Sequence, residues 1–332
     1  MPPLAGPCPR DRAPLRLASG AAARVSWPAA MPPPAPAPAD AAPPPAAAAR
    51  VLEYYAATAA DYRTWSPGSN MHFGYYRRGM NPLRLEPMLA AMNDELIQAL
   101  HLPGGRPARV LDLGCGLGAT ARHLARRHPQ VEVTGVTVVP TQVREGNRLA
   151  RAEGLGERVR VVQADYTRLP FADRSVDRAY ALESACHAEG PDKPAFVREL
   201  ARVLRPGGRF AILDGFMKHA EPLPAWLERV RACVCAGWAV PEFPELGAFT
   251  RTLRTCGLQP LEVRDISWNV APSVTHVPRT MLRVLLAELR STGALRLGRA
   301  RWGNLVAPGL GVVLGLARRH FGYHLIAGRR AE

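Results

Sequence analysis

From Arg50 to Asp214 the chain alternates between two hydrophobic patterns. Short runs of consecutive apolar residues predict buried strands, and stretches with apolar residues at helical spacing predict the helices between them. Because strand and helix alternate, we expect an α/β architecture, with a parallel sheet that helices cover on both faces. The predicted helices are 50–62, 82–102, 118–129, 140–155 and 194–204, and the predicted strands are 108–115, 131–138, 159–165, 176–184 and 208–216.

The alternation ends after residue 216, where the pattern predicts a strand at 258–267, a helix at 278–292 and a final strand at 323–330. Before the final strand lie two mostly apolar segments, 268–295 and 305–316. An apolar insertion at this place is typical of a lid over a hydrophobic ligand. A dimer interface formed by the same helices is the alternative.

The first 49 residues have a different composition, rich in proline and alanine, with few large apolar side chains. Such a segment gains too little from burial to offset the entropy of ordering, so we expect a disordered extension. It lacks the apolar core of a secretory signal, but its arginine-rich, acid-poor composition leaves an organelle transit peptide open. Met31 is an alternative start. No apolar run in the chain approaches the roughly 18 residues of a membrane span.

The formal net charge is +15 and comes almost entirely from arginine, since Lys193 and Lys218 are the two lysines. Residues 290–332 contain eight arginines and one acid. Such a region attracts nucleic acid, an anionic membrane or an anionic substrate. The cysteines lack the paired spacing of a secreted disulfide framework or a zinc site, which indicates a reducing interior and no metal. They are Cys8, Cys115, Cys186, Cys233, Cys235 and Cys256.

The strand predicted at 108–115 leads into a glycine-rich loop, and the stretch "LDLGCGLGAT" spans both. It places Gly114, Gly116 and Gly118 at alternate positions after Asp112. A P-loop is excluded because its Gly-Lys-Ser/Thr ending is absent, and the dinucleotide fingerprint requires a longer gap before its third glycine. A carboxylate at Asp112 would repel a pyrophosphate and attract a cationic ligand. The loop therefore predicts a cationic ligand.

The stretch "VLDLGCGLGATARHLA" resembles the first motif of class I S-adenosylmethionine-dependent methyltransferases. The resemblance implies a Rossmann-like, seven-stranded, mostly parallel sheet with an antiparallel last strand, and S-adenosylmethionine as cofactor. Residues 114–118, including Cys115, would approach its amino-acid portion, with Asp112 near the amino group. Thr137 and Gln142 are the candidates for the ribose, at a place where the family commonly has an acid. Asp165 and Tyr166, in a stretch that resembles the third motif, would contact the adenine.

The stretch from Tyr54 to Tyr76 contains "HFGYY" and resembles the cap of the sterol, tocopherol and cyclopropane-forming subgroup. Its rings Tyr55, Phe73 and Tyr75 are candidate substrate contacts, because aromatic faces stabilise cations without trapping them. Ordinary cap packing is the alternative for these rings. Glu183 and His187 lie four residues apart after the fourth predicted strand, where open α/β sheets bind ligands. Either is a candidate general base, and the alternative for Glu183 is that it orders the loop by hydrogen bonding.

These observations predict a cap at 50–108, a cofactor-binding core at 109–216, and lid helices with the last strands at 217–332. The predicted activity is methyl transfer to a hydrophobic small molecule, with carbon of a prenyl-like or sterol-like acceptor favoured over the nitrogen or oxygen of a natural product. A nucleic-acid methyltransferase is disfavoured because no catalytic Asn-Pro-Pro-Tyr type motif or RNA-binding appendage is present. A catalytically silent cofactor-binding subunit is disfavoured because the cofactor motif is intact. We expect a cytoplasmic monomer or homodimer whose arginine-rich C-terminal region touches membranes peripherally.

Overall fold

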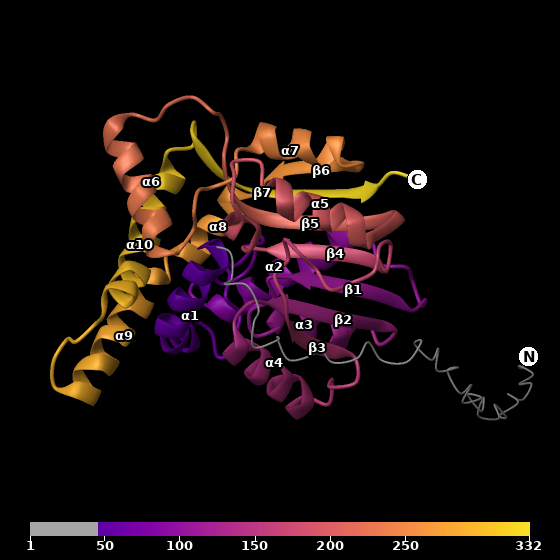
Figure 1. Ribbon diagram of the computed structural model, residues 1–332. Helices are drawn as coiled ribbons and strands as arrows, with labels where there is room; N and C mark the ends of the chain where they lie inside the picture. Colours follow the sequence, from indigo (N-terminus) through magenta and orange to yellow (C-terminus); the bar gives the residue numbers. More distant parts are fainter. Residues whose placement is uncertain (1–45) are drawn as a thin grey trace, which may run out of the picture. The chain divides into compact units, whose positions relative to one another are not determined.

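The computed structural model describes residues 46–332, so the predictions for residues 1–45 lie outside the described part. Its centre is a seven-stranded sheet with the order β3-β2-β1-β4-β5-β7-β6 (Figure 1). The first five strands run parallel, whereas β7 runs antiparallel to both of its neighbours. This confirms the predicted sheet. The strands are β1 (Ala108–Leu113), β2 (Val131–Thr137), β3 (Val159–Gln163), β4 (Val176–Leu182), β5 (Leu204–Met217), β6 (Leu258–Asp265) and β7 (Phe321–Arg330).

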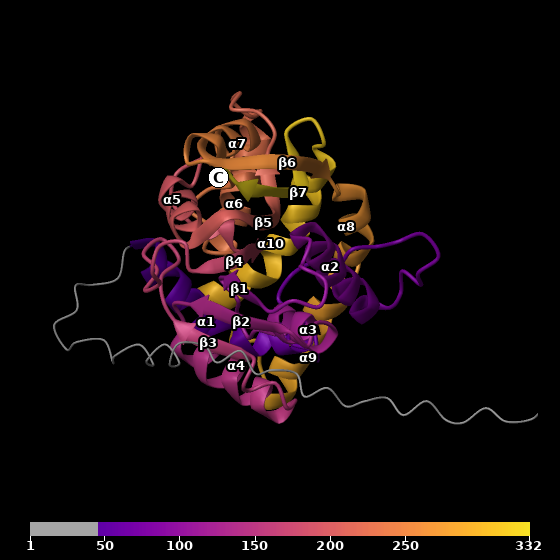
Figure 2. The ribbon, with the colours of Figure 1, turned by 90° about the vertical axis from the view of Figure 1, so that its right-hand side faces the viewer.

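Helices cover both faces of the sheet, which is why its strands are apolar at consecutive positions. In β1, Val110 packs under α2, α3 and α4, whereas Leu111 packs on the other face with α5 and α7. Figure 2 shows α5 and α7 on one side of the sheet and α2 on the other. The covering helices are α2 (Leu85–Leu100), α3 (Ala119–Arg127), α4 (Pro140–Ala152), α5 (Pro194–Val203) and α7 (Leu246–Thr255).

A second group of helices gathers beyond the carboxyl ends of the parallel strands (Figure 1). The group comprises α1 (Ala46–Trp65), α6 (Ala225–Gly237), α8 (Ser267–Val274), α9 (Val277–Thr292) and α10 (Arg299–Leu316). α6 and α10 approach closely at Gly237 and Gly303: a Cβ on Gly237 would lie 2.7 Å from the carbonyl oxygen of Gly303 and 2.6 Å from the Cβ of Ala307. The predicted apolar insertion before the last strand is therefore present, whereas the dimer interface stays a prediction. None of the described helices is long and apolar enough to cross a membrane.

The fold corrects the sequence-based assignments in three places. α1 begins at Ala46, so the last four residues of the expected disordered extension are helical. α2 was assigned to the cap, but its buried face, including Met92 and Leu96, packs on the sheet within the main core. α6 and α7 were not predicted, although Leu246, Phe249 and Leu253 of α7 recur at helical spacing and pack against the core.

Candidate functional site

The site lies where the strand order reverses, between β1 and β4, whose carboxyl ends are adjacent. Open α/β sheets bind ligands at such a point because the connections leave on opposite faces and open a crevice. Asp112 lies near the end of β1, and Glu183 directly follows β4. Glu183 has a φ of +51°, and its backbone N–H donates to the carbonyl of Leu213 on β5. This backbone conformation is uncommon for a residue other than glycine and is often associated with function.

The glycine loop after β1 is too crowded for side chains. Gly114 has a φ of +84°, and a Cβ there would lie 2.4 Å from the Cβ of Ser184. Gly116 has a φ of +52°, and its Cβ would lie 2.9 Å from the sulfur of Met71. Gly118 has a different role from the one predicted: it precedes the first turn of α3 with a φ of +70° and does not line the cavity. Gly114 and Gly116 line the cavity without a side chain, so a ligand can contact their backbone directly.

Asp112 is buried at the floor of this cavity, with 3% of its surface exposed. Its Oδ2 accepts a hydrogen bond of 2.8 Å from the Tyr180 hydroxyl, and no basic side chain among residues 46–332 forms an ion pair with it. Burial raises the pKa of Asp112 from 3.8 to about 7. A bound ammonium group would compensate this buried charge, so the residues present fit the amino end of S-adenosylmethionine.

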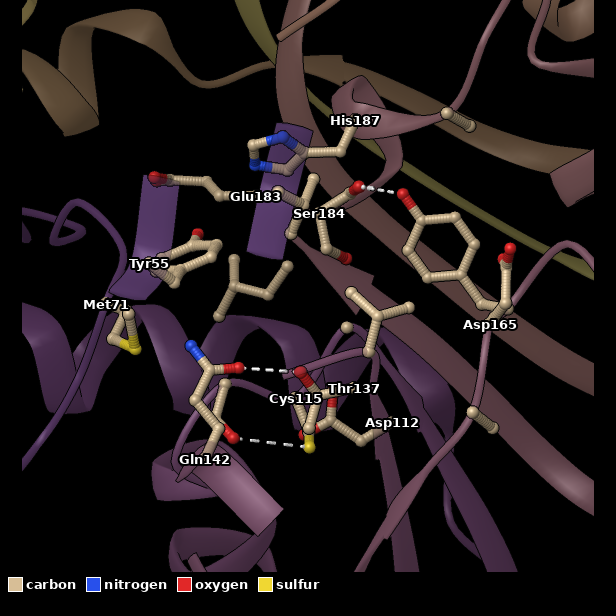
Figure 3. Close-up of a pocket in the computed structure, with 18 of the residues that line it drawn as sticks. Tyr55, Met71, Asp112, Cys115, Thr137, Gln142, Asp165, Glu183, Ser184 and His187 are labelled. Carbon is tan, nitrogen blue, oxygen red and sulfur yellow. Dashed lines mark hydrogen bonds between the residues drawn. The ribbon is translucent and has the colours of Figure 1, made fainter. Parts of the chain in front are cut away.

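The other predicted cofactor contacts line the same cavity, which has about 1150 Å³ of empty space, part of it open to solvent. Thr137 donates a 2.6 Å hydrogen bond to Oε1 of Gln142, so the two ribose candidates are linked to each other (Figure 3). Asp165 accepts from the amide and the hydroxyl of Thr167, and the Tyr166 hydroxyl donates to the carbonyl of Ser184. Within residues 46–332, neither the Gln142 amide nitrogen nor the second Asp165 oxygen has a hydrogen-bond partner, so both can bind a ligand.

A second cavity, with about 1740 Å³ of empty space, adjoins the first and extends under α8, α9 and α10. Its lining is mainly aromatic and aliphatic, with Trp65, Phe73, Trp238, Phe243 and Phe321 among the rings. Five residues line both cavities: Tyr55, Met71, His72, Glu183 and His187. The smaller chamber, which contains Asp112, and the larger, more strongly apolar chamber therefore meet at the two candidate bases.

Glu183 is held rigidly at this junction. One carboxylate oxygen, Oε1, accepts hydrogen bonds from the backbone N–H of Phe73 at 2.7 Å and from the Tyr323 hydroxyl at 2.8 Å. Burial raises the pKa of Glu183 from 4.5 to about 8, although both hydrogen bonds act in the opposite direction. The carboxyl group is therefore largely protonated at neutral pH while the site is without a cation, and it is a poor proton acceptor in that state.

Burial shifts the pKa of His187 in the opposite direction from that of Glu183. Its Nδ1 lies 3.3 Å from the carbonyl of Ala239, an arrangement in which Nδ1–H donates. Burial lowers the pKa of His187 from 6.5 to about 4, so the ring is neutral at physiological pH. With the proton on Nδ1, Nε2 has a lone pair, and no described residue is hydrogen-bonded to it. The ring lies near Glu183 and Tyr55 (Figure 3), with 6.2 Å between the His187 and Tyr55 ring centroids.

The structure places two of the three predicted aromatic contacts on the apolar cavity and leaves the third outside both cavities. Tyr55 and Phe73 line the apolar cavity, but Tyr75 is buried in the main core and lines neither cavity. Its backbone N–H donates to the carbonyl of Met88, which turns this part of the chain toward α2. Sequence reasoning also missed Met71, Trp238 and Tyr323. Met71 lies within the cap stretch from Tyr54 to Tyr76, directly before "HFGYY", but the other two are distant in sequence.

Fold and site together define a class I S-adenosylmethionine-dependent methyltransferase. Residues 110–208 match the family model described as a methyltransferase domain. The chain is 34% identical over 253 residues to methyltransferase GfsG of Streptomyces halstedii, covering 74% of this chain and 85% of the relative. It is 35% identical over 258 residues to 27-O-demethylrifamycin SV methyltransferase of Amycolatopsis mediterranei, covering 76% and 90%. The chain belongs to this methyltransferase family, in the small-molecule subgroup related to the sterol, tocopherol and cyclopropane-forming enzymes, and its cofactor is S-adenosylmethionine.

More distant relatives are chemically varied. Cycloartenol-C-24-methyltransferase 1 of Oryza sativa subsp. japonica is 29% identical over 244 residues, covering 73% of this chain and 68% of the relative. The cyclopropane synthase MmaA2 of Mycobacterium tuberculosis superposes with a TM-score of 0.71 at 17% identity, over 86% of this chain and 99% of that one. The [4+2]-cyclase SpnF gives 0.70 at 22% identity, over 85% and 95%. These two structures establish the shared fold.

Proposed function

We propose that this enzyme methylates a hydroxyl group of a bulky, hydrophobic small molecule, with His187 as the proton acceptor. The observation that carries the proposal is the neutral His187 ring at the junction of the two cavities, with its Nδ1 proton held by Ala239. One relative supports it: 27-O-demethylrifamycin SV methyltransferase, covered over 90% of its length, is named for the methylation of an oxygen.

S-adenosylmethionine supplies an electrophilic methyl group, and its transfer is an in-line displacement that depends on alignment in a dry site. Asp112 would hold the amino end, Asp165 and Tyr166 the adenine end, and the chamber under α8–α10 would hold the acceptor. An alcohol is a weak nucleophile until its proton is removed. Nε2 of His187 takes this proton as the acceptor oxygen forms its new bond.

Carbon methylation of a prenyl-like or sterol-like acceptor, which the sequence favoured, is the second candidate. The observation in its favour is the set of rings beside Glu183: Phe73 lies 5.9 Å from Trp65 and 6.3 Å from Trp238 between ring centroids. Aromatic faces stabilise the cation that forms when an alkene is methylated. The Glu183 carboxyl group would then act in removing a proton from carbon, and the cycloartenol relative belongs to this chemical class.

The test compares His187→Asn with His101→Asn, a matched control at the exposed C-terminus of α2. Each protein is incubated with labelled S-adenosylmethionine and a panel of hydroxylated polyketides, phenols, prenyl alcohols and sterols, and the organic extract is counted. We expect His187→Asn to lose about 100-fold in kcat or more, within the range for general bases, with unchanged cofactor affinity. Hot hydriodic acid then releases the label from an O-methyl group, whereas a C-methyl group resists it. Full activity in His187→Asn, or label that resists the acid, would contradict the proposal.

We further propose a cytoplasmic enzyme that touches anionic membranes through α9. This helix exposes Leu282, Leu286 and Leu289 on one side, and Arg283 and Arg290 are exposed beside them. Exposed leucines flanked by arginines suit the boundary between headgroups and acyl chains. Sedimentation with phosphatidylserine vesicles tests this proposal: wild type should bind, Leu286→Glu should bind less, and binding to neutral vesicles should be weak. Failure of the wild-type protein to bind phosphatidylserine vesicles would refute the proposal.

A further inference from the structure

Lys193 is a buried ammonium group next to the site, and neither cofactor nor acceptor contacts account for it. It precedes the first turn of α5, has a φ of +53°, and none of its surface is exposed. Among residues 46–332 it forms no ion pair with a carboxylate; its Nζ donates instead to three backbone carbonyls. Burying a charge costs free energy, and the three hydrogen bonds from Nζ offset only part of that cost, so a position with this arrangement calls for an explanation.

The three carbonyls belong to the two segments that hold His187. Nζ lies 3.2 Å from the carbonyl oxygen of Cys186 and 2.7 Å from that of Ala188, so it is hydrogen-bonded to the backbone on both sides of His187. Its third bond, 2.7 Å to Glu242, reaches the loop that also contains Ala239, the partner of His187 Nδ1.

From the opposite side, the same short segment is held by β5. Asp214 accepts a 3.0 Å hydrogen bond from the backbone N–H of Cys186. The Asp214 carboxylate thus binds the N–H group, and the Lys193 ammonium the carbonyl, of Cys186. Cys186 is the middle residue of a short 3₁₀ turn, Ala185–His187. The turn is too short to hold its own orientation, so these contacts decide where the His187 ring points.

The amino-acid type supports a specific requirement for lysine. Arginine and lysine together number 43, and only Lys193 and Lys218 are lysine. An ammonium group carries three donors around one nitrogen and can serve three carbonyls that converge on a point, whereas a guanidinium presents its donors in a planar fork.

We infer that Lys193 is a positioning residue: it holds the segment of His187 and the loop of Ala239 together, so that Nδ1 stays protonated and Nε2 faces the acceptor. The link to catalysis rests on the proposed function, but the effect on the ring itself does not. Several titratable groups lie on the elements packed around His187, and Lys193 is the cation among them within the described chain. They are Tyr55 and Tyr62 of α1, Glu183 and Cys186 of the same segment, Asp214 of β5, Cys235 of α6, Glu242 of the loop that follows it, Tyr323 of β7, and Lys193 at the N-terminus of α5.

Nuclear magnetic resonance of protein labelled with ¹⁵N-histidine tests this inference on the full chain, with the His187 signals assigned by their loss in His187→Asn. In wild type we expect one tautomer, protonated at Nδ1, that does not titrate near neutral pH. In Lys193→Met the ring should become a mixture of tautomers, and its pKa should rise because a neighbouring cation is lost. Lys218→Met is the matched control, since Lys218 pairs with Asp265 at 2.8 Å. There the His187 signals should remain as in wild type.

Lys193→Arg provides the second variant if the methionine protein does not fold, as judged by circular dichroism and by calorimetric binding of sinefungin. It retains the charge but not the three convergent donors, so we expect a mixed tautomer with a low pKa. With an acceptor found by the panel above, kcat should fall about 10- to 100-fold in either folded variant while KM changes little, as expected for a misplaced base. A His187 ring with the wild-type tautomer in every Lys193 variant that folds would overturn the inference. Altered ring signals together with full activity in His187→Asn would leave the positioning role intact and refute the proposed base.

Discussion

Asp112→Asn is the substitution that most sharply separates charge from shape in the cofactor cavity. The amide has nearly the size of the carboxylate, and its oxygen can still accept the 2.8 Å hydrogen bond from Tyr180. What it lacks is the negative charge facing the amino end of S-adenosylmethionine. A hydrogen bond to a charged partner contributes about 1.5–3 kcal/mol. The variant should therefore bind the cofactor about 10- to 150-fold more weakly.

The pH dependence gives the same prediction a second readout. The pKa of Asp112 in the ligand-free protein is about 7, so below that pH the carboxyl group must lose a proton before it attracts a cation. Wild-type affinity should fall by up to about tenfold per pH unit between pH 7 and 5, whereas the asparagine variant should lack this dependence.

Titration calorimetry with two ligands provides the control. S-adenosylmethionine carries the amino-acid portion, and 5′-methylthioadenosine lacks it. We expect Asp112→Asn to weaken only the first. An equal loss for both ligands would mean that the substitution damages the cavity as a whole, and no loss for either would refute the placement of the amino group at Asp112.

Three further predictions concern the same cavities. Gly114→Ala should abolish cofactor binding in calorimetry with little change in circular dichroism, because its Cβ would lie 2.4 Å from Ser184 at a φ of +84°; wild-type affinity would contradict this. Trp238→Ala should raise the KM for the acceptor and leave cofactor affinity unchanged, since Trp238 lines only the apolar cavity; a selective loss of cofactor affinity would count against the division into two chambers. Asp112→Asn should be more stable than ligand-free wild type at pH 8, because the folded-state pKa is raised from 3.8 to about 7 and the buried acid must ionise there. The gain is at most about 4 kcal/mol, disappears toward pH 4, and is measured by urea unfolding; equal stability of the two proteins at pH 8 would refute it.

The sheet and the cofactor loop were predictable because their signals are local. Consecutive apolar residues in β1 reflect burial on both faces, and the spacing of Gly114 and Gly116 after Asp112 reflects a backbone that meets Ser184 and Met71. Asp112 and Glu183 could be placed at the same sheet edge because each follows a strand in a parallel sheet.

The acceptor side was less predictable because its contacts join distant segments. His187 and Ala239 are 52 residues apart, and Glu183 and Tyr323 are 140 apart. Tyr75 was misassigned for a related reason: Gly74 packs so closely on α2 that its Cβ would lie 2.6 Å from that of Met88. The chain there follows α2 into the core, which no alternation of residues within "HFGYY" reveals.

The central claim is methyl transfer to an oxygen of a hydrophobic acceptor, and the position of the transferred carbon tests it most directly. Wild-type enzyme and His187→Asn are supplied with ¹³C-methyl S-adenosylmethionine and the best acceptor of the panel, and the extracted product is examined by ¹³C nuclear magnetic resonance. We predict a methoxy resonance from wild type and almost none from His187→Asn. A methyl resonance on carbon, formed equally by both proteins, would contradict the account.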